Sequence, residues 1–191
     1  MTDSGTLAVA PQLALRTLQE ADAEALFACI ERNRVYLREW LPWLDSNIQV
    51  ADSRRFISSA QNNRATGEAE VFAVSWHGEL VGTCSLDAMD RASGTANIGY
   101  WLSEAHTGQG LMTRCAQRLL RFGFTERALG TVTLNVAEGN LKSIAIAQRL
   151  GFQCTRKVIQ AEDLYGVSVN HLRYTLNDSD FMDAMPHDPG H

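Results

Sequence analysis

The sequence predicts a single layered domain of α/β or α+β class, in which helices lie on the faces of a mixed β-sheet. The chain has 191 residues, which is enough for one well-buried domain and few for two. Hydrophobic residues make up 45% of the chain and charged residues 20%, a balance typical of globular proteins. The spacing of hydrophobic residues changes from a helical period before residue 65 to a two-residue alternation after residue 70. These observations favour a folded domain that contains both helices and strands.

The first third of the chain contains one expected strand followed by helices. Residues 13–18 alternate weakly between apolar and polar side chains, which predicts a strand. Helical spacing then covers three segments, at 22–32, 36–40 and 50–64. Asp22 is a suitable N-cap for the first of these helices.

Beyond residue 67 the pattern is rich in strands. Alternating apolar runs predict strands at 70–76, 80–86, 95–102, 131–136, 152–161 and 167–176. Helical spacing predicts helices at 110–125 and 140–150. The strands and helices do not alternate one for one, and the chain contains no GxGxxG sequence. A Rossmann dinucleotide-binding domain is therefore not favoured.

Both ends of the chain are predicted to be flexible, which leaves residues 12–176 as the folded domain. Residues 1–11 are small and polar up to Pro11. Residues 177–191 contain four aspartates and two prolines. Such compositions are typical of loose termini.

Composition and charge exclude several classes of function. No segment approaches 18 consecutive apolar residues, so no membrane-spanning helix is expected. The first residues lack a basic segment followed by an apolar stretch, which argues against a secretion signal and favours a cytoplasmic protein. The net charge is −5 and no basic run is longer than Arg54-Arg55, so no nucleic-acid partner is expected.

The four cysteines do not predict a metal site. Cys29, Cys84, Cys115 and Cys154 are widely spaced and form no CxxC pair. No metal is expected, and the simplest interpretation is that these cysteines are small buried side chains. A nucleophilic role for Cys84 or Cys115 is an alternative, because both lie near the motifs described next.

The most informative local feature is a two-glycine loop between an expected strand and an expected helix. The strand ends at Leu102, and the helix begins after Gly108-Gln109-Gly110. The first amides of a helix lack partners within the helix and carry the positive end of its dipole. Glycines let these amides close around a pyrophosphate, and Thr113 adds a hydroxyl. A simple turn is the alternative. The loop is not a Walker A sequence, because no lysine followed by serine or threonine comes after Gly110.

With its preceding strand, Ile98-Gly99-Tyr100-Trp101-Leu102, this loop resembles motif A of the GNAT N-acetyltransferase superfamily. A second match lies about 30 residues downstream, where Asn140-Leu141-Lys142-Ser143 is followed by Arg149-Leu150-Gly151-Phe152. Within the superfamily, Tyr36–Trp43 and Gln160–Glu162 are most similar to the RimJ/RimL-type ribosomal-protein N-acetyltransferases.

The resemblance covers residues 12–176 and implies a GNAT-like, mostly antiparallel twisted sheet of about seven strands flanked by helices. It implies acetyl-CoA as co-substrate, with pyrophosphate on the backbone of Gln109–Thr113 and pantetheine beside Tyr100–Leu102. A backbone amide at the end of that strand would polarise the thioester carbonyl. Thr107 and Met112 depart from the usual family residues, which is expected to change affinity only. The residues expected to contact the cofactor are Tyr100, Trp101, Leu102, Gly108, Gln109, Gly110, Leu111, Met112, Thr113, Asn140 and Ser143.

Two residues are expected to move protons during acetyl transfer. The resemblance implies that Ser143, in the first turn of its helix, is the acid that protonates the departing thiolate. The alternative is purely local, with Asn140 as the N-cap and Ser143 as a neutral first-turn residue. Glu162 is the expected base, directly or through water, and Asp163 is its rival. A solvated charged pair at a strand end is the alternative for both carboxylates.

The acceptor is expected to be an amine. Tyr36, Trp40 and Trp43 are candidates for the wall of its cleft, although aromatic residues at this spacing also occur in cores. His106 is a possible second base. The predicted function is transfer of an acetyl group from acetyl-CoA to the N-terminal amine of a ribosomal or other protein. The alternatives are a small amine such as a polyamine or aminoglycoside, and a non-catalytic acyl-CoA-binding module. The resemblance makes a homodimer plausible.

Overall fold

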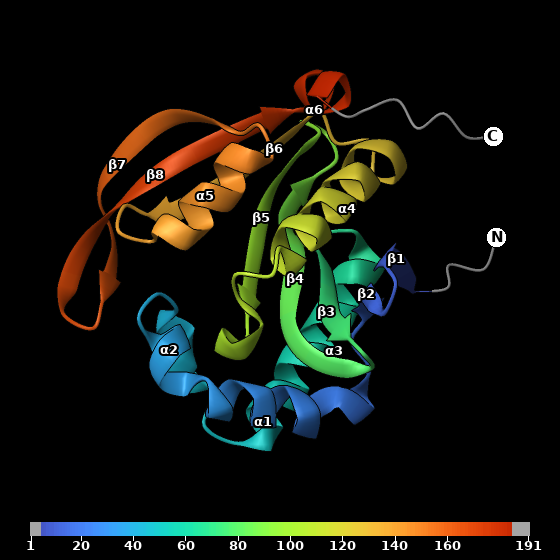
Figure 1. Ribbon diagram of the computed structural model, residues 1–191, viewed down its shortest axis with the longest axis vertical. Helices are drawn as coiled ribbons and strands as arrows, with labels where there is room; N and C mark the ends of the chain where they lie inside the picture. The colour runs from blue at the N-terminus through green and yellow to red at the C-terminus, as the bar shows by residue number, and fades with distance from the viewer. Residues whose placement is uncertain (1–4, 185–191) are drawn as a thin grey trace.

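The computed structural model describes residues 5–184 and contains one eight-stranded sheet with helices on both faces (Figure 1). The strand order across the sheet is β1-β2-β3-β4-β5-β6-β8-β7. The strands are β1 (Thr6–Ala10), β2 (Leu13–Thr17), β3 (Glu70–Trp76), β4 (Glu79–Asp90), β5 (Thr95–Leu102), β6 (Thr131–Ala137), β7 (Gln153–Leu164) and β8 (Val167–Asn177).

The α-helices follow the expected order. They are α1 (Ala23–Arg32), α2 (Arg34–Arg38), α3 (Val50–Thr66), α4 (Leu111–Glu126), α5 (Leu141–Arg149) and α6 (Asp178–Ala184). Short 3₁₀ helices at Glu20–Asp22, Pro42–Ser46 and Glu104–His106 connect some of these elements. The mixed, mostly antiparallel sheet with flanking helices confirms the predicted fold class.

Both ends are more ordered than the composition predicts, so the expectation of flexible segments is wrong for part of each. The strand β1 lies within residues 1–11 and pairs antiparallel with β2, while Leu7 is buried. The helix α6 lies within residues 177–191, and its Phe181 packs on Phe124 with ring centroids 5.3 Å apart. Each segment is ordered by one apolar side chain and a surface that it packs on. For the first segment this surface is the edge of strand β2, and for the second it is the core next to Phe124. Residues 1–4 and 185–191 lie outside the described part.

The sheet contains one parallel pairing, and this pairing is short. Strands β5 and β6 pair only where Thr95–Asn97 of β5 lies beside Thr131–Thr133 of β6. All other neighbouring strands are antiparallel. The carboxyl-terminal half of β5, from Ile98 to Leu102, therefore pairs with β4 and not with β6. The sheet is split beside this half of β5.

Two hydrophobic cores hold the helices on the sheet. The larger core includes the α4 residues Cys115, Leu119 and Phe122, and the Phe122 ring meets that of Phe72 edge-on at 5.8 Å. The smaller core lies under α1 and α3 on the other face and includes Trp101 of β5. Because side chains of a strand alternate between its faces, β5 contributes to both cores. In residues 5–184, no helix is long and apolar enough to cross a membrane.

Candidate active site

A cleft of about 890 Å³ lies where the sheet is split. Its walls come from α2 and the residues just after it, the end of β5, the loop before α4, the first turn of α4, and one side of α5 along its length. Figure 1 shows where these elements lie. The expected site residues that line this cleft are Tyr36, Trp40, Tyr100, Trp101, Leu102, Gly108, Gly110, Leu111, Met112, Thr113, Asn140 and Ser143. Gln109, Trp43 and Glu162 are not among the lining residues. Segments from three separate regions of the sequence thus meet around one cavity.

The start of α4 is built to receive an anion. Gly110 is its N-cap residue with φ +73°, and Gly108 has φ +75°, both in the left-handed region that favours glycine. No side chain of the described residues caps this helix. The amides of Leu111 to Thr113 lie in the first turn, where no helical carbonyl can receive them. The Gln109 side chain donates to the carbonyl of Ala105 at 3.2 Å, which leaves the backbone as the contact surface of the loop.

Three cations line the same cleft. They are Arg114 of α4 and Lys142 and Arg149 of α5. Together with the uncapped helix start they favour a ligand that carries several phosphates. The sequence pattern does not single out these cations, because basic residues on helices are common on solvated surfaces. Their shared orientation depends on how α4 and α5 pack. The cleft therefore fits the phosphates and the long arm of a coenzyme A molecule.

Ser143 and Tyr100 form a hydroxyl pair inside the cleft. Their oxygens are 2.9 Å apart, and either one can donate. Ser143 lies in the first turn of α5, and its backbone amide donates to the Asn140 side chain at 3.1 Å. Asn140 is thus an N-cap, as the local interpretation predicts, and the cap fixes the position of the serine. Burial raises the pKa of Tyr100, so this phenol is neutral and available as a hydrogen-bond partner.

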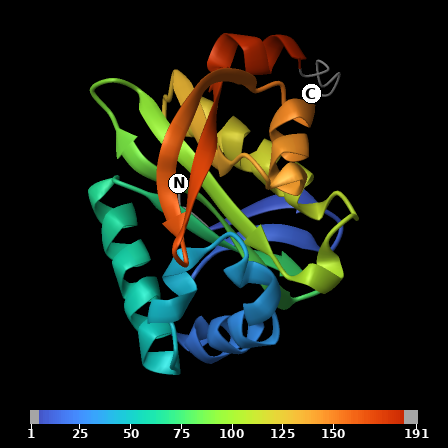
Figure 2. The same cartoon turned by 90° about the vertical axis from the view of Figure 1, so that its left-hand side faces the viewer.

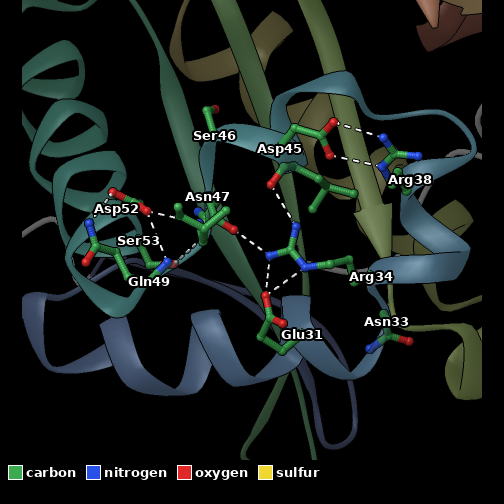
Figure 3. Close-up of polar contacts among 12 residues, drawn as sticks. Glu31, Asn33, Arg34, Arg38, Asp45, Ser46, Asn47, Gln49, Asp52 and Ser53 are labelled. Carbon is green, nitrogen blue, oxygen red and sulfur yellow. Dashed lines mark hydrogen bonds and ion pairs between the residues drawn. The ribbon is translucent and has the colours of Figure 1, made fainter. Parts of the chain in front are cut away.

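Two arginines of α2 bind the segment that follows this helix (Figure 3). Arg34 donates to the carbonyl of Leu44 at 2.7 Å and also contacts the carbonyl of Asn47. Arg38 donates twice to the Asp45 carboxylate, with both distances 3.0 Å, and these bonds lower the pKa of Asp45. The segment after α2 is therefore tied back onto the helix, which keeps the inner face of α2 against the cavity.

Two of the three expected cleft aromatics occupy the α2 wall. Tyr36 and Trp40 line the cavity, and the Lys142 ammonium lies 4.8 Å from the centroid of the Tyr36 ring. Trp43 is 39% exposed and follows the break at Pro42, so it does not contribute to this wall. The expectation for Trp43 is not supported by its position, because the 3₁₀ turn directs it away from the inner face.

Strands β7 and β8 form an arm whose tip reaches α2 (Figure 2). The Tyr165 hydroxyl donates to the carbonyl of Leu41 at 3.0 Å, and the Arg38 guanidinium stacks 3.6 Å from the centroid of the Tyr165 ring. Leu41 also lines the cleft. The arm and the cofactor cleft are thus connected through one short segment.

Glu162 lies on this arm, not in the cleft. Its Oε2 is 3.1 Å from Nε2 of His171, across the β7–β8 pairing. The rival Asp163 accepts the amide of Gly166 at 2.8 Å and therefore stabilises the turn of the arm. His106, the other candidate base, does line the cleft, and its buried Nδ1 has no hydrogen-bond partner within the described residues.

The cysteines near the motifs are unsuited to nucleophilic catalysis. Cys29, Cys84 and Cys115 are buried, which agrees with the simplest interpretation, whereas Cys154 is exposed. Burial raises the pKa of Cys115 to about 12 and that of Cys84 well above its ordinary value. Neither thiol supplies a thiolate near neutral pH. Across the described part of the chain, no group of three or more His, Cys, Asp or Glu side chains could hold a metal ion.

Comparisons with known proteins agree with this geometry. The chain matches the model of the acetyltransferase (GNAT) domain over residues 12–153. It is 32% identical over 149 residues to the putative ribosomal N-acetyltransferase YdaF of Bacillus subtilis (strain 168), and the match covers 77% of this chain and 81% of that protein. It is 28% identical over 159 residues to the ribosomal-protein-serine acetyltransferase of Escherichia coli (strain K12), with coverage of 83% and 89%.

A solved structure shows the same fold with a ligand. The structure of RimL, a ribosomal L7/L12 alpha-N-protein acetyltransferase in complex with coenzyme A, superposes with a TM-score of 0.88. The two sequences are 25% identical, and the superposition covers 90% of this chain and 97% of the other.

Proposed function

The chain belongs to the GNAT acetyltransferase family and is an acetyl-CoA-dependent N-acetyltransferase; from this premise we propose that its acceptor is the N-terminal amine of a protein, with a ribosomal protein as the expected substrate. The observation that carries the proposal is the convergence of the uncapped α4 start and the Ser143–Tyr100 pair on one cleft. The names of the related ribosomal-protein acetyltransferases support the class of acceptor.

The cofactor contacts that we propose use mostly backbone. The first-turn amides of α4, from Leu111 to Thr113, would hold the pyrophosphate, and Arg114 and Arg149 would add charge. The free edge of β5 offers amides of the Tyr100–Leu102 strand to a thioester carbonyl. When bound, acetyl-CoA supplies the activated acetyl group. These contacts require little from side chains, so the departures at Thr107 and Met112 are compatible with binding.

We propose Ser143 as the acid at the departing sulfur, with Tyr100 as its hydrogen-bond partner. A hydroxyl that donates to a thiolate must itself be replenished, and the neutral Tyr100 phenol is placed to do so. Asn140 supports this role indirectly, because its side chain fixes the first turn of α5.

We propose Glu162 as the base that acts through water. Its carboxylate is hydrogen bonded to His171 and lies outside the cleft. A water molecule would therefore carry the proton from the acceptor nitrogen to Glu162. The turn contact of Asp163 makes that carboxylate the weaker candidate.

Thiol release from acetyl-CoA tests the proposed acceptor. A synthetic peptide with an N-terminal serine should release one thiol for each acetylated amine, detected by mass spectrometry. The same peptide with a blocked N-terminus should release none, and spermidine should be a poor acceptor. Efficient turnover of spermidine with an inert peptide would replace the protein acceptor by a small amine, and no turnover with any amine would favour an acyl-CoA-binding module.

Three further expectations complete the proposal. We propose a cytoplasmic protein without a nucleic-acid partner, and a homodimer in solution. Analytical ultracentrifugation of the full chain would check the dimer, and a sedimenting monomer at micromolar concentration would contradict it.

A further inference from the structure

The face of the sheet opposite α4 and α5 includes a polar surface across four strands. It is built from Ser85 and Asp87 of β4, Asn97 of β5, Thr133 of β6 and Thr175 of β8. Each of these side chains is half-buried. Three cross-strand pairings connect these residues: Asp87 with Asn97, Asn97 with Thr133, and Thr133 with Thr175. Paired residues point to the same side of a sheet, so these side chains share one face. We call these five residues the polar face; in Figure 2, β4 and β5 pass between α3 and the β7–β8 arm.

The polar face and the cofactor cleft meet at the split in the sheet. Asn97 is the last β5 residue that pairs with β6, and Gly99 lies two positions after it. It faces the same way as Asn97, whereas the next residue, Tyr100, faces Ser143 in the cleft. An acyl group held along the free edge of β5 would therefore lie between the cleft and the polar face.

The Asp87 carboxylate lies over the backbone of β5 next to Gly99. Its Oδ2 accepts from the Ser85 hydroxyl at 2.6 Å. A Cβ atom added at Gly99 would lie 3.3 Å from that same Oδ2 and 3.3 Å from the Ser85 hydroxyl. The carboxylate thus reaches diagonally from β4 over β5. Because neighbouring strands are about 4.8 Å apart, it stands within one strand width of the split.

Asp87 differs from the other shielded carboxylates in having no cation beside it. Within residues 5–184 the only hydrogen-bond partner of its carboxylate is the Ser85 hydroxyl, and the carboxylate makes no ion pair. Burial therefore raises its pKa, and only the Ser85 bond opposes that effect. Three other carboxylates of low side-chain exposure are each accompanied by arginine: Asp22 by Arg16, Asp52 by Arg55, and Glu70 by Arg64 and Arg127. A partly buried, unpaired carboxylate is a favourable place for an incoming cation.

We propose that Asp87 binds the amino group of the acceptor and holds it beside the split in the sheet, with the hydrogen of Gly99 leaving room for it. This inference rests on the proposed function, because it assigns to that reaction the residue that selects an amine. The other carboxylates of low exposure are paired with arginines of the chain. Asp87 would instead be paired with the ammonium group of the substrate.

The role of Asp87 is separable from that of Glu162. An ammonium group has three N–H bonds, so one can donate to Asp87 while another proton leaves through water towards Glu162. The neutral amine then still donates one N–H to Asp87 when its lone pair attacks the acetyl carbon. The C–S bond breaks as the C–N bond forms, the second nitrogen proton is lost to solvent, and the thiolate takes a proton from Ser143. Asp87 should therefore act on acceptor binding, whereas Glu162 should act on turnover.

Steady-state kinetics of Asp87→Asn with acetyl-CoA and the N-terminal serine peptide test the inference. We expect the KM for the peptide to rise at least about tenfold, with the KM for acetyl-CoA unchanged. The melting temperature should stay equal to that of the wild type or rise, because the substitution removes a partly buried charge without a partner. A merely structural role would instead lower the melting temperature and affect both substrates.

Two further variants sharpen the result. Gly99→Ala should also raise the peptide KM, because its Cβ crowds the carboxylate. Asp90→Asn is the matched control on the same strand, since Asp90 is exposed and bonded to Ser93 in the β4–β5 turn, and it should leave both KM values unchanged.

The outcomes distinguish the two levels of the proposal. A wild-type enzyme that acetylates the peptide, with an Asp87→Asn variant whose peptide KM lies within twofold of it, would overturn the role of Asp87 alone. A wild-type enzyme that releases no thiol with the peptide would overturn the proposed acceptor and this inference with it.

Discussion

Gly99 and Tyr100 are neighbours on β5, yet they belong to two regions that are built in different ways. On the Tyr100 side, the cofactor cleft is made from helix starts, a glycine loop and one hydroxyl pair. On the Gly99 side, the polar face is made from side chains of four strands and includes Asp87, and Glu162 lies on the β7–β8 arm. The first region offers positive charge to phosphates, and the second offers negative charge to an amine.

This difference shows how one split sheet can separate two substrates. The backbone amides that we propose hold the cofactor depend on conformation more than on side-chain identity. Side chains on the other face are open to change without loss of the cofactor site. The two regions should therefore respond independently to substitution, and the following predictions test that independence.

The largest effect is expected in the cleft, at Ser143. Ser143→Ala should lower kcat by about 10²-fold, because a general acid contributes about that much or more. The dissociation constant of acetyl-CoA, measured by calorimetry, should change less than about twofold. Tyr100→Phe should have a smaller effect on kcat, since it removes only the partner of the acid. Unchanged turnover in Ser143→Ala would remove the acid role.

The second effect concerns cofactor binding itself. Gly110→Val should weaken acetyl-CoA binding by about 30-fold, because a left-handed φ of +73° costs a side-chain-bearing residue about 2 kcal/mol and a branched residue crowds the approach to the loop. Gly78→Val is the matched control, since Gly78 has φ +82° and equally open surroundings in the β3–β4 turn. If both variants bind acetyl-CoA like the wild type, the loop is only a turn.

The third effect lies on the acceptor side, at Glu162. Glu162→Gln should lower kcat by about tenfold and leave acetyl-CoA affinity intact, as expected for a base that acts through water. Asp163→Asn provides the comparison, because that carboxylate serves the turn of the arm. A larger loss of turnover in Asp163→Asn than in Glu162→Gln would reverse the assignment.

The smallest effect is expected where the β7–β8 arm contacts the segment that lines the cleft. Tyr165→Phe removes the hydroxyl that ties the arm to Leu41, a bond with a net contribution of about 1 kcal/mol. The KM for the peptide should rise a few-fold, whereas the affinity for acetyl-CoA, titrated in parallel, should not change. Equal losses for both substrates would show that the arm and the cleft are not independent.

The sequence by itself determined the fold class and the local geometry of the segments that we propose bind the cofactor. Residues 98–113 carry a strand, a glycine loop and a helix start in succession, so their geometry follows from local rules. The same holds for Asn140 and Ser143, which lie three positions apart in one helical turn. Turn and capping contacts of this kind need no knowledge of distant parts of the chain.

Only the tertiary structure decided the acceptor half. Asp87 reaches Gly99 because of the β4–β5 register, and Tyr165 meets Leu41 across 124 positions of sequence. The ordering of β1 and α6 likewise depended on a strand edge and a core surface that the terminal segments do not contain. Register and packing are set by the whole sheet, since each strand can present either face until its neighbours fix it. A local pattern therefore predicted where we propose that the phosphates bind, and the assembled sheet decided which carboxylates lie on the face that we propose for the acceptor.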